Sequence, residues 1–447
     1  MCKRATWLVF IIALLVLWVV GCVQTAPAPP APAEEPAAVE QAAPAEEPAP
    51  AEEAAEAGSI KIWSRQDLQD TTDPNSVTLK EKIAAFEAET GITVVYEQVA
   101  FDQLATKLAL AVQSGGDVPD VVEAGSQHIP SLIDAGAIMA LDDLLKDEPW
   151  VAELTEGDKA ACVVGGVRYC VATNVRGGIT YYRNADFPDG FPETSEGWLQ
   201  EGARLKEAGK YLSTFYAGRG SGAIEVGWWP FIAANGGRIF DDEGKPAWAS
   251  PEVVEVVEFG RQMLQQGYLP EADFTGDFAD AEAPWIEGQS ASFRGGSWSS
   301  IFVPGLQEQV DKGEVGTTGG IRFGDGEPHV FLVSESWVVA EGSQNPEGAR
   351  AWLRSFMQPE FLAKWAEAQY GIPTTQAAYE AGQFGSGFYK TIDEILSSQG
   401  LYMEQSPYYN ESLDALAIAF QEMMLDPKID ALERLQRAQD EVLNRYW

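Results

Sequence analysis

Two short polar stretches carry the groups best suited to hold a small polar molecule. They are WSRQD, residues 63–67, and EAGSQH, residues 123–128, and each stands at the end of an expected strand. Carboxylates, amides and hydroxyls exchange hydrogen bonds with hydroxyl groups, and the Glu123 carboxylate can accept from two neighbouring hydroxyls at once. Because ligands collect at the carboxyl ends of strands in open α/β sheets, both stretches predict the edge of a binding site.

A pair of adjacent tryptophans offers a different kind of contact. The stretch EVGWWPFIAANGG, residues 225–237, predicts a helix with proline in its first turn and two glycines at its end. Neighbouring helical residues point about 100° apart, so the two indole rings cannot share one environment. Trp229 is in register with apolar residues three and four positions later, which predicts a core position. Trp228, with Glu225 one turn behind it, is the half predicted to face a ligand.

Charge and histidine content exclude several functions. The chain has 447 residues and a formal net charge of −38, which excludes contact with nucleic acid phosphates. The two histidines, His128 and His329, are far apart and have no second His or Cys at ligand spacing. We therefore expect no metal site, no histidine-dependent triad and no cofactor.

The elements that position these residues alternate between strands and helices. The expected strands are SIKIWS (59–64), ITVVYEQV (92–99) and DVVEAG (120–125), and the helices between them are LKEKIAAFEAETG (79–91) and FDQLATKLALAVQSGG (101–116). This β-α-β-α-β order predicts an α/β lobe built on a parallel sheet.

The first 21 residues have the features of an export signal. Lys3 and Arg4 precede an apolar run that is shorter than the roughly 20 residues of a membrane span. The run ends in VVGC, residues 19–22, which resembles the bacterial lipobox and predicts that Cys22 carries a lipid. An ordinary secretory signal with an incidental cysteine is the alternative.

Residues 22–58 are expected to form a tether. From Ala26 to Ala57 the chain consists largely of alanine, proline and glutamate, without aromatic, lysine or arginine residues. Such a segment cannot bury enough apolar surface to fold, and if fully extended it reaches on the order of 100 Å.

Cys162 and Cys170 flank the sequence VVGGVRY, whose Gly-Gly pair predicts a hairpin turn. The two cysteines can face each other across the hairpin, and outside the cytoplasm a disulfide is expected. Two free buried thiols are the alternative. In both cases the role is structural.

The order of several further segments resembles the family 1 extracellular solute-binding proteins, the maltose-binding-protein-like sugar-binding lipoproteins of ABC importers. The matching segments are AAFEAETGITV (84–94), LALAVQSGGDVPDVVEAG (108–125), IPSLIDAGAIMALDDLL (129–145), ITYYRNADF (179–187), WWPFIAANGGRIFDDEGKPAWASPEVVEVVEF (228–259), ASFRGGSW (291–298), EGSQNPEGARAWLRSFMQPE (341–360) and GIPTTQAAY (371–379). Two positions depart from the family pattern, since Ala172 replaces a frequent proline and ETSEGW (193–198) stands where TW is common.

The resemblance implies an α/β, two-lobed periplasmic-binding-protein fold. Each lobe is then a mainly parallel sheet flanked by helices, with the ligand cleft between the lobes and a hinge of several chain crossings. The expected parts are an N-terminal lobe of 59–173 and 330–373, a C-terminal lobe of 174–329 and 374–447, and crossings near 173–178, 329–332 and 371–375. Glycines at positions 177, 178 and 371 tolerate the dihedral changes of a hinge.

The resemblance also implies which residues line the cleft. The predicted ligand-binding residues are Arg65, Asp67, Glu123, Ser126, Gln127, Asn174, Arg176, Glu225, Trp228, Trp298, Trp337, Tyr408 and Tyr409. Trp298 matches the position where the family stacks tryptophan on a pyranose ring. For the others a structural role is the alternative: a helix N-cap for Ser126, interlobe hydrogen bonds for Asn174 and Arg176, burial for Trp337, and surface packing for the two tyrosines.

The expected function is that of a lipid-anchored, extracytoplasmic and monomeric receptor, not an enzyme. It captures a mono- or oligosaccharide and delivers it to the permease subunits of an ABC importer. One alternative keeps the receptor but changes the ligand to a polyol, a phosphorylated polyol or another anionic metabolite, because Arg65, Arg176, Arg219 and Arg294 suit an anion. A secreted glycoside hydrolase is a second alternative, but no acid/base carboxylate pair stands out by spacing.

Overall fold

The computed structural model describes residues 58–276 and 278–447, which belong to one compact unit, Ala55–Trp447. The expected signal peptide, the lipidated Cys22 and all of the expected tether except Gly58 lie outside these residues. Within the described ranges, no helix is both long and apolar enough to cross a bilayer.

One mixed sheet runs through the unit in the strand order β2-β1-β3-β10-β6-β8-β7, with β11 and β9 paired to β6 and β12 paired to β10. The strands are β1 (Ser59–Ser64), β2 (Thr93–Gln98), β3 (Val121–Gly125), β4 (Val163–Val164), β5 (Val167–Arg168), β6 (Val171–Arg183), β7 (Tyr211–Phe215), β8 (Ser290–Gly296), β9 (Val315–Thr318), β10 (Val330–Val339), β11 (Ile372–Pro373) and β12 (Gly400–Tyr402). The pairs β1–β2, β1–β3 and β7–β8 are parallel, whereas β6 is antiparallel to both β8 and β10.

Helices surround this sheet. They are α1 (Pro74–Thr90), α2 (Phe101–Ser114), α3 (Ile129–Asp134), α4 (Asp142–Leu145), α5 (Glu156–Cys162), α6 (Ser195–Glu207), α7 (Trp229–Ala234), α8 (Pro251–Gln265), α9 (Phe278–Ile286), α10 (Leu306–Asp311), α11 (Pro346–Phe356), α12 (Pro359–Ala368), α13 (Gln376–Ala381), α14 (Gly387–Gln399), α15 (Tyr409–Leu425) and α16 (Ala431–Tyr446). The strand-and-helix alternation confirms the predicted α/β class.

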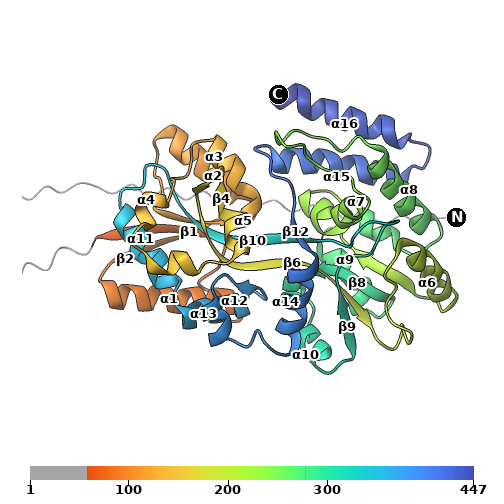
Figure 1. Cartoon of the computed structure of the whole chain (residues 1–447), viewed down its shortest axis with the longest axis horizontal. Helices are drawn as coiled ribbons and strands as arrows, with labels where there is room; N and C mark the ends of the chain where they lie inside the picture. Colours follow the sequence, from red (N-terminus) through yellow and green to blue (C-terminus); the bar gives the residue numbers. More distant parts are fainter. Residues whose placement is uncertain (1–57, 277) are drawn as a thin grey trace, which may run out of the picture. The chain divides into compact units, whose positions relative to one another are not determined.

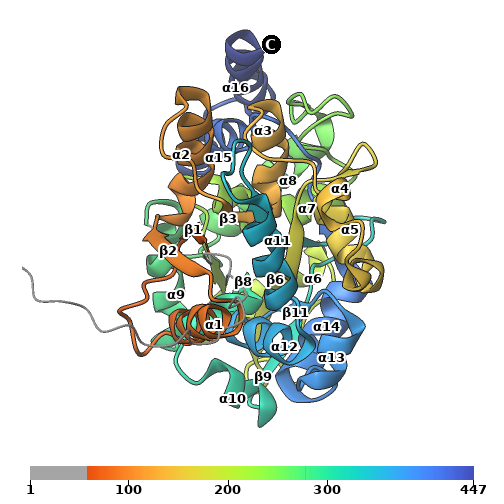
Figure 2. The same cartoon turned by 90° about the vertical axis from the view of Figure 1, so that its left-hand side faces the viewer.

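The N-lobe is built on β1, β2 and β3, and Figure 2 looks onto it. Alternate residues of a strand point to opposite faces, so Val121 packs with α1, α11 and α12 while Val122 packs with α2 and α3. The ends of α1 show why the chain folds this way locally. Asp73 accepts from two backbone N–H groups of the first turn, and Gly91 ends the helix in the left-handed conformation.

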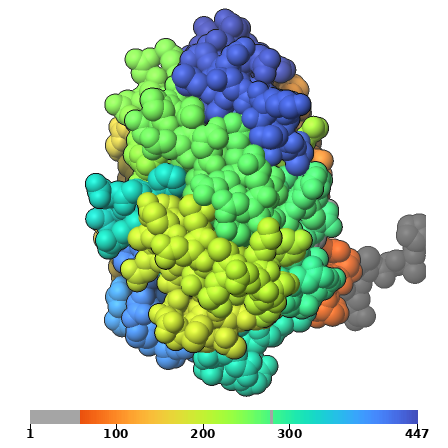
Figure 3. Space-filling view, turned by 90° about the vertical axis from the view of Figure 1, so that its right-hand side faces the viewer, coloured from red at the N-terminus to blue at the C-terminus, as the bar shows by residue number. Residues whose placement is uncertain are grey.

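The C-lobe is built on β7, β8 and β9. Its core contains residues of β7 and of helices α6, α7, α8, α15 and α16. Figure 3 shows the C-terminal helices, in blue, against the green segment that includes α8. The two long strands β6 and β10 pass from one lobe into the other (Figure 1), so both lobes share these strands.

Cys162 and Cys170 form a disulfide across the short hairpin of β4 and β5. Gly165 and Gly166 both have positive φ, which the predicted Gly-Gly turn requires. The expected disulfide is therefore present, and the alternative of two free buried thiols is wrong. The bond ties the end of α5 to the start of β6.

Because the disulfide closes a loop, we expect its removal to destabilise the protein. Replacing both Cys162 and Cys170 by serine should lower the free energy of unfolding by about 2.5 kcal/mol, the chain-entropy value for a loop of this size. Urea unfolding of the two forms measures this difference. A double variant as stable as the parent would show that the bond adds nothing to the fold.

Candidate functional site

Four charged side chains meet on neighbouring strands. Arg65 follows β1, Glu123 lies in β3, Glu335 in β10 and Arg176 in β6, and these strands are consecutive in the sheet. Glu123 and Glu335 are each 2% exposed and Arg176 is 8% exposed. The group therefore combines two positive and two negative charges in the interior of the protein.

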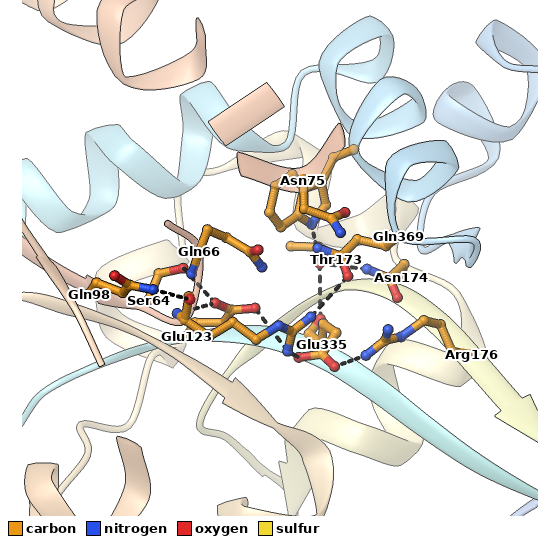
Figure 4. A network of polar contacts seen from close by, with 12 residues as sticks. Ser64, Gln66, Asn75, Gln98, Glu123, Thr173, Asn174, Arg176, Glu335 and Gln369 are labelled. Atoms are coloured by element: carbon orange, nitrogen blue, oxygen red, sulfur yellow. Dashed lines mark hydrogen bonds and ion pairs between the residues drawn. The ribbon is translucent and has the colours of Figure 1, made fainter. Parts of the chain in front are cut away.

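Direct ion pairs connect the four groups (Figure 4). Arg65 Nη1 lies 3.2 Å from Glu123 Oε1 and donates to Glu335 Oε2 at 2.8 Å, and Arg176 Nη2 donates to Glu335 Oε1. Ser64 Oγ and the Arg65 backbone N–H both donate to Glu123 Oε2, at 2.6 and 3.1 Å. We call Arg65, Glu123, Arg176 and Glu335 the ion-pair cluster.

A loop after α12 closes over the ion-pair cluster. Gln369 Oε1 accepts from Arg65 Nη2 at 2.9 Å. A Cβ atom at Gly371 would lie 2.7 Å from Asn174 Oδ1 and 2.9 Å from the Arg176 side chain, so only glycine permits this approach. Tyr370, between Gln369 and Gly371 in the sequence, has a φ of 53°. It is the one non-glycine residue with positive φ in the described chain. The backbone is thus held close to the cluster.

Several buried polar atoms around this cluster accept or donate no hydrogen bond within the part of the chain that the structure describes. The donors are Gln66 Nε2, Arg176 Nε and Gln369 Nε2, and the acceptors are Asn174 Oδ1 and Glu123 Oε1, which among the described residues has only its ion pair with Arg65, at 3.2 Å. Burying such groups without partners is costly, and the set contains both donors and acceptors. It therefore matches hydroxyl groups, each of which donates one hydrogen bond and accepts others.

An aromatic ring from each lobe lies beside the cluster. The Arg65 guanidinium carbon is 4.9 Å from the centre of the Phe101 ring at the start of α2. The Arg176 guanidinium carbon is 5.3 Å from the centre of the Trp298 ring, which follows β8. Trp298 is only partly buried and its ring lies against Gly296, where a side chain would overlap it. Aromatic faces and hydrogen-bonding groups are thus present together.

A narrow cavity of about 20 Å³ lies further along β10, with room for one water. Ser126 and Gln127 of the N-lobe and Tyr402, Glu404 and Tyr409 of the C-terminal segment line it, together with Phe331. Phe331 and Glu335 are four residues apart in one strand, so their side chains point to the same face. The cavity and the ion-pair cluster are two parts of one surface along β10.

Glu225 adjoins this cavity through a hydrogen bond that Tyr409 Oη donates to Glu225 Oε1 at 2.9 Å. Burial raises the pKa of Glu225 to about 7, although the bond from Tyr409 lowers it in part, and the nearby Asp414 carboxylate raises it further. Both residues were predicted to bind the ligand. Tyr409 lines the cavity, whereas Glu225 is 8% exposed and reaches the cavity only through Tyr409.

The raised pKa of Glu225 has a consequence for stability. The folded protein binds one proton more than the unfolded chain between about pH 5 and pH 7, so this carboxyl makes the fold less stable as the pH rises through that window. Glu225→Gln should remove that part of the pH dependence. Urea unfolding at intervals from pH 5 to pH 7.5 tests it, and superimposable profiles for parent and variant would contradict it.

The structure corrects the assignment within the tryptophan pair. Trp228, predicted to face a ligand, is 1% exposed and its ring contacts Phe215, Phe274 and Phe420 in the C-lobe core. Trp229, predicted to be core, is also buried, but its ring lies 6.2 Å from that of Phe331, which lines the cavity. Both rings pack, and Trp229 is the nearer to the site.

Other predicted residues lie away from the ion-pair cluster. Trp337 is 1% exposed and packs edge-on against Trp352 and Phe356, so it belongs to the N-lobe core. Asp67 is exposed and accepts from the Gln69 backbone N–H in a local turn. Tyr408 stacks on Tyr446 at 4.6 Å, at the end of α16. These three positions do not face the site in this structure.

Ser126, Gln127 and Asn174 do lie at the site. Ser126 is not the N-cap of α3, because its hydroxyl instead accepts from the Ser334 backbone N–H at 3.1 Å and so fastens β10. Gln127 Oε1 is buried without a partner among the described residues. Asn174 Nδ2 donates to Thr173 Oγ1 at 3.2 Å.

The site also contains residues that the sequence did not reveal. These are Glu335, Gln369, Phe101, Phe331 and Glu404, whereas Gln66 lies in the stretch 63–67 that was expected at the site. Glu335 alone had a visible signal, since an acidic residue within the apolar strand VFLVSESWVV is unusual.

Comparisons with known proteins agree with this architecture. Residues 70–366 match the model of the bacterial extracellular solute-binding protein family. The "Probable amino-acid ABC transporter periplasmic-binding protein y4oP" of Sinorhizobium fredii is 26% identical over 295 residues, which are 62% of this chain and 65% of that protein. The chain thus spans just under two thirds of the length of that relative.

Two solved structures have the same fold at low sequence identity. The GacH receptor of Streptomyces glaucescens, solved unliganded and with acarbose, has a TM-score of 0.73 at 15% identity and covers 86% of this chain and 97% of its own. A solute-binding protein of an ABC transporter from Thermotoga lettingae, bound to α-D-tagatose, has a TM-score of 0.72 at 20% identity, with 86% and 98% covered. The family model spans well over half of the sequence, and the chain belongs to the bacterial extracellular solute-binding protein family.

Proposed function

We propose that this protein is the substrate-binding component of an ABC importer and that it captures a carbohydrate between its two lobes. The observation that carries the proposal is the set of buried donors and acceptors around the ion-pair cluster, because sugar hydroxyls are both donors and acceptors. The Trp298 side chain, which is only partly buried, supplies apolar surface against which a sugar ring can pack. Closure of the lobes then buries both kinds of contact.

The charges of the cluster support a ligand rich in hydroxyls over a simple anion. Arg65 and Arg176 are paired with Glu123 and Glu335, and Arg219 donates to Gln421 at 2.9 Å. Of the four arginines expected to suit an anion, three thus have partners within the protein. The two structural neighbours were solved with acarbose and with α-D-tagatose, whereas the relative from Sinorhizobium is named for amino acids.

An enzymatic role has less support. Glu123 and Glu335 are the buried carboxylates of the site, and both are ion-paired with arginines instead of facing each other as an acid and a base across a glycosidic bond. The family and the fold are those of binding proteins. Incubation of the protein with oligosaccharides should leave them intact.

A thermal-shift panel of neutral sugars, acidic sugars, polyols, phosphorylated polyols and amino acids tests the ligand class. A ligand that binds only the folded state raises the melting temperature, so a carbohydrate should do so at moderate concentration. Mass spectrometry of the protein purified under native conditions identifies any ligand that it retains. Stabilisation by amino acids alone would contradict the carbohydrate proposal, and stabilisation only by anionic metabolites would favour the anion alternative.

We also propose that the chain is exported and anchored outside the cytoplasm by a lipid on Cys22. The support is the sequence of residues 1–58, a signal of lipobox type followed by an Ala/Pro/Glu tract. Wild-type protein should sediment with the membrane fraction of the cell, and Cys22→Ser should not. Equal membrane association of both would contradict the anchor.

A further inference from the structure

Arg294, in β8 of the C-lobe, is a buried cation without a counterion among the residues that the structure describes. The residue is 4% exposed, and its guanidinium carbon lies 4.3 Å from the centre of the Phe231 ring. Burial lowers its pKa to about 9. Among the described residues, the Arg294 side chain forms neither an ion pair nor a hydrogen bond, and the Phe231 ring is its aromatic contact.

The other buried arginines of the described chain do have acidic partners. They are Arg168 with Asp158, Arg176 with Glu335, Arg261 with Glu258 and Arg434 with Glu422. Burying an unpaired charge opposes folding, and an apolar side chain of similar volume would fit the same place at lower cost. The stability of the fold therefore gives no reason for a guanidinium at position 294.

The position of Arg294 in the sheet suggests a functional reason for the guanidinium. In the pairing of β6 with β8, Arg294 lies opposite Thr180, and Gly296 lies opposite Gly178. Arg294 and Gly296 point to the same face of β8, and the Trp298 ring covers that face at Gly296. The guanidinium carbon of Arg176 lies 5.3 Å from the centre of the same Trp298 ring. Arg294 thus lies two residues before Gly296, on the face of β8 that Trp298 covers.

We propose that Arg294 recognises an anionic group on the solute, and that the carbohydrate is an acidic sugar with one carboxylate or one phosphate. This inference rests on the proposed function. The ion-pair cluster is balanced in charge and takes the hydroxyl groups, whereas Arg294 holds the anion through the paired N–H groups of its guanidinium. The anion supplies the countercharge that the protein itself does not.

The test uses the full chain and three variants. Arg294→Met removes the charge and keeps the volume, Arg294→Lys keeps the charge without the paired donors, and Arg261→Met is the matched control. Arg261 lies in the same lobe and is 6% exposed, but it donates to the backbone carbonyls of Met423 and Ile429. Titration calorimetry compares glucose with glucuronate and glucose 6-phosphate, and galactose with galacturonate, and differential scanning calorimetry gives the melting temperature without ligand.

An acidic sugar should bind the parent at least about 10-fold more tightly than its neutral counterpart, and Arg294→Met should weaken that binding about 100-fold. Arg294→Lys should retain part of the affinity. Without ligand, Arg294→Met should melt no lower than the parent, whereas Arg261→Met should melt lower and keep the preference for the acidic sugar. The comparison of glucuronate with glucose 6-phosphate separates a carboxylate from a phosphate.

Other outcomes separate the two proposals. Tight binding of a neutral sugar, unchanged in Arg294→Met, would overturn the role of Arg294 and leave the carbohydrate receptor standing. A further outcome is that the parent binds inorganic phosphate or acidic metabolites without sugar rings, and that Arg294→Met loses that binding. This result would overturn the proposal of a carbohydrate ligand and support anion recognition by Arg294. A melting temperature that falls as far in Arg294→Met as in Arg261→Met would give Arg294 a structural role and overturn the inference, as would an absence of binding by every sugar and anion.

Discussion

Glu335→Gln should lower the free energy of unfolding by about 3 kcal/mol, the cost of removing one partner from a buried ion pair. The Glu335 carboxylate binds both Arg65 and Arg176, so its neutralisation leaves one of these arginines buried without an acid and places two positive charges near each other. Solute binding should weaken at the same time, because the cluster lines the candidate site. Urea unfolding measures the stability and calorimetry the affinity.

A second substitution separates charge from packing in this result. Arg176→Met in the Glu335→Gln background removes the stranded charge, so the double variant should recover part of the lost stability. Arg65 retains its ion pair with Glu123 in that variant. A loss below about 1 kcal/mol for Glu335→Gln, or no recovery on adding Arg176→Met, would contradict the pairing described for this cluster.

Trp298→Ala should weaken carbohydrate binding by about 2 kcal/mol, roughly 30-fold in Kd, and have little effect on folding. The ring is partly exposed and contacts the Arg176 guanidinium on one face, so its removal takes contact area from the solute more than from the core. The affinity of the variant and its melting temperature measure the two effects separately.

Trp337→Ala is the matched control, since it removes the same side chain from the N-lobe core. Trp337 is 1% exposed and packs against Trp352 and Phe356, so the loss in unfolding free energy should be about 4 kcal/mol. The affinity of the molecules that remain folded should not change. If Trp298→Ala destabilised the protein as much as Trp337→Ala and bound solute normally, Trp298 would be a core residue.

Local sequence patterns predicted the elements well. The strand expected at 59–64 matches β1, the helix expected at 101–116 corresponds to α2, and the Gly-Gly turn between Cys162 and Cys170 is present with its disulfide. These features depend on residues close in the sequence, such as a positive φ at a glycine or apolar residues at one period. The order of the segments also led to the correct family.

The tryptophan pair shows where such local reasoning fails. A period of 3.6 residues per turn separates the two rings only if one regular α-helix runs through both of them. In the structure Ala223–Trp228 is π-helical and the α-helix begins at Trp229, so the residues before the junction do not follow the α-helical period. The side predicted for Trp228 was wrong for this reason, and α8 and α15 enclose its ring instead.

The ion-pair cluster could be predicted only in part, because long-range strand pairing creates it. Glu123 and Arg176 were assigned to the site from their positions at a strand end and at a chain crossing. Glu335 joins them because β10 enters the sheet between β3 and β6, a placement that depends on residues more than 150 positions apart. Gln369 reaches Arg65 only through the close approach at Gly371. No local pattern contains that information.

Titration calorimetry of the full chain with mono- and oligosaccharides, beside amino acids, tests the proposed function most directly. At least one carbohydrate should bind with a stoichiometry of one to one, and Trp298→Ala and Glu335→Gln should both weaken this binding while Trp337→Ala should not. Binding of amino acids alone, or a carbohydrate affinity that neither Trp298→Ala nor Glu335→Gln changes, would contradict the proposed function.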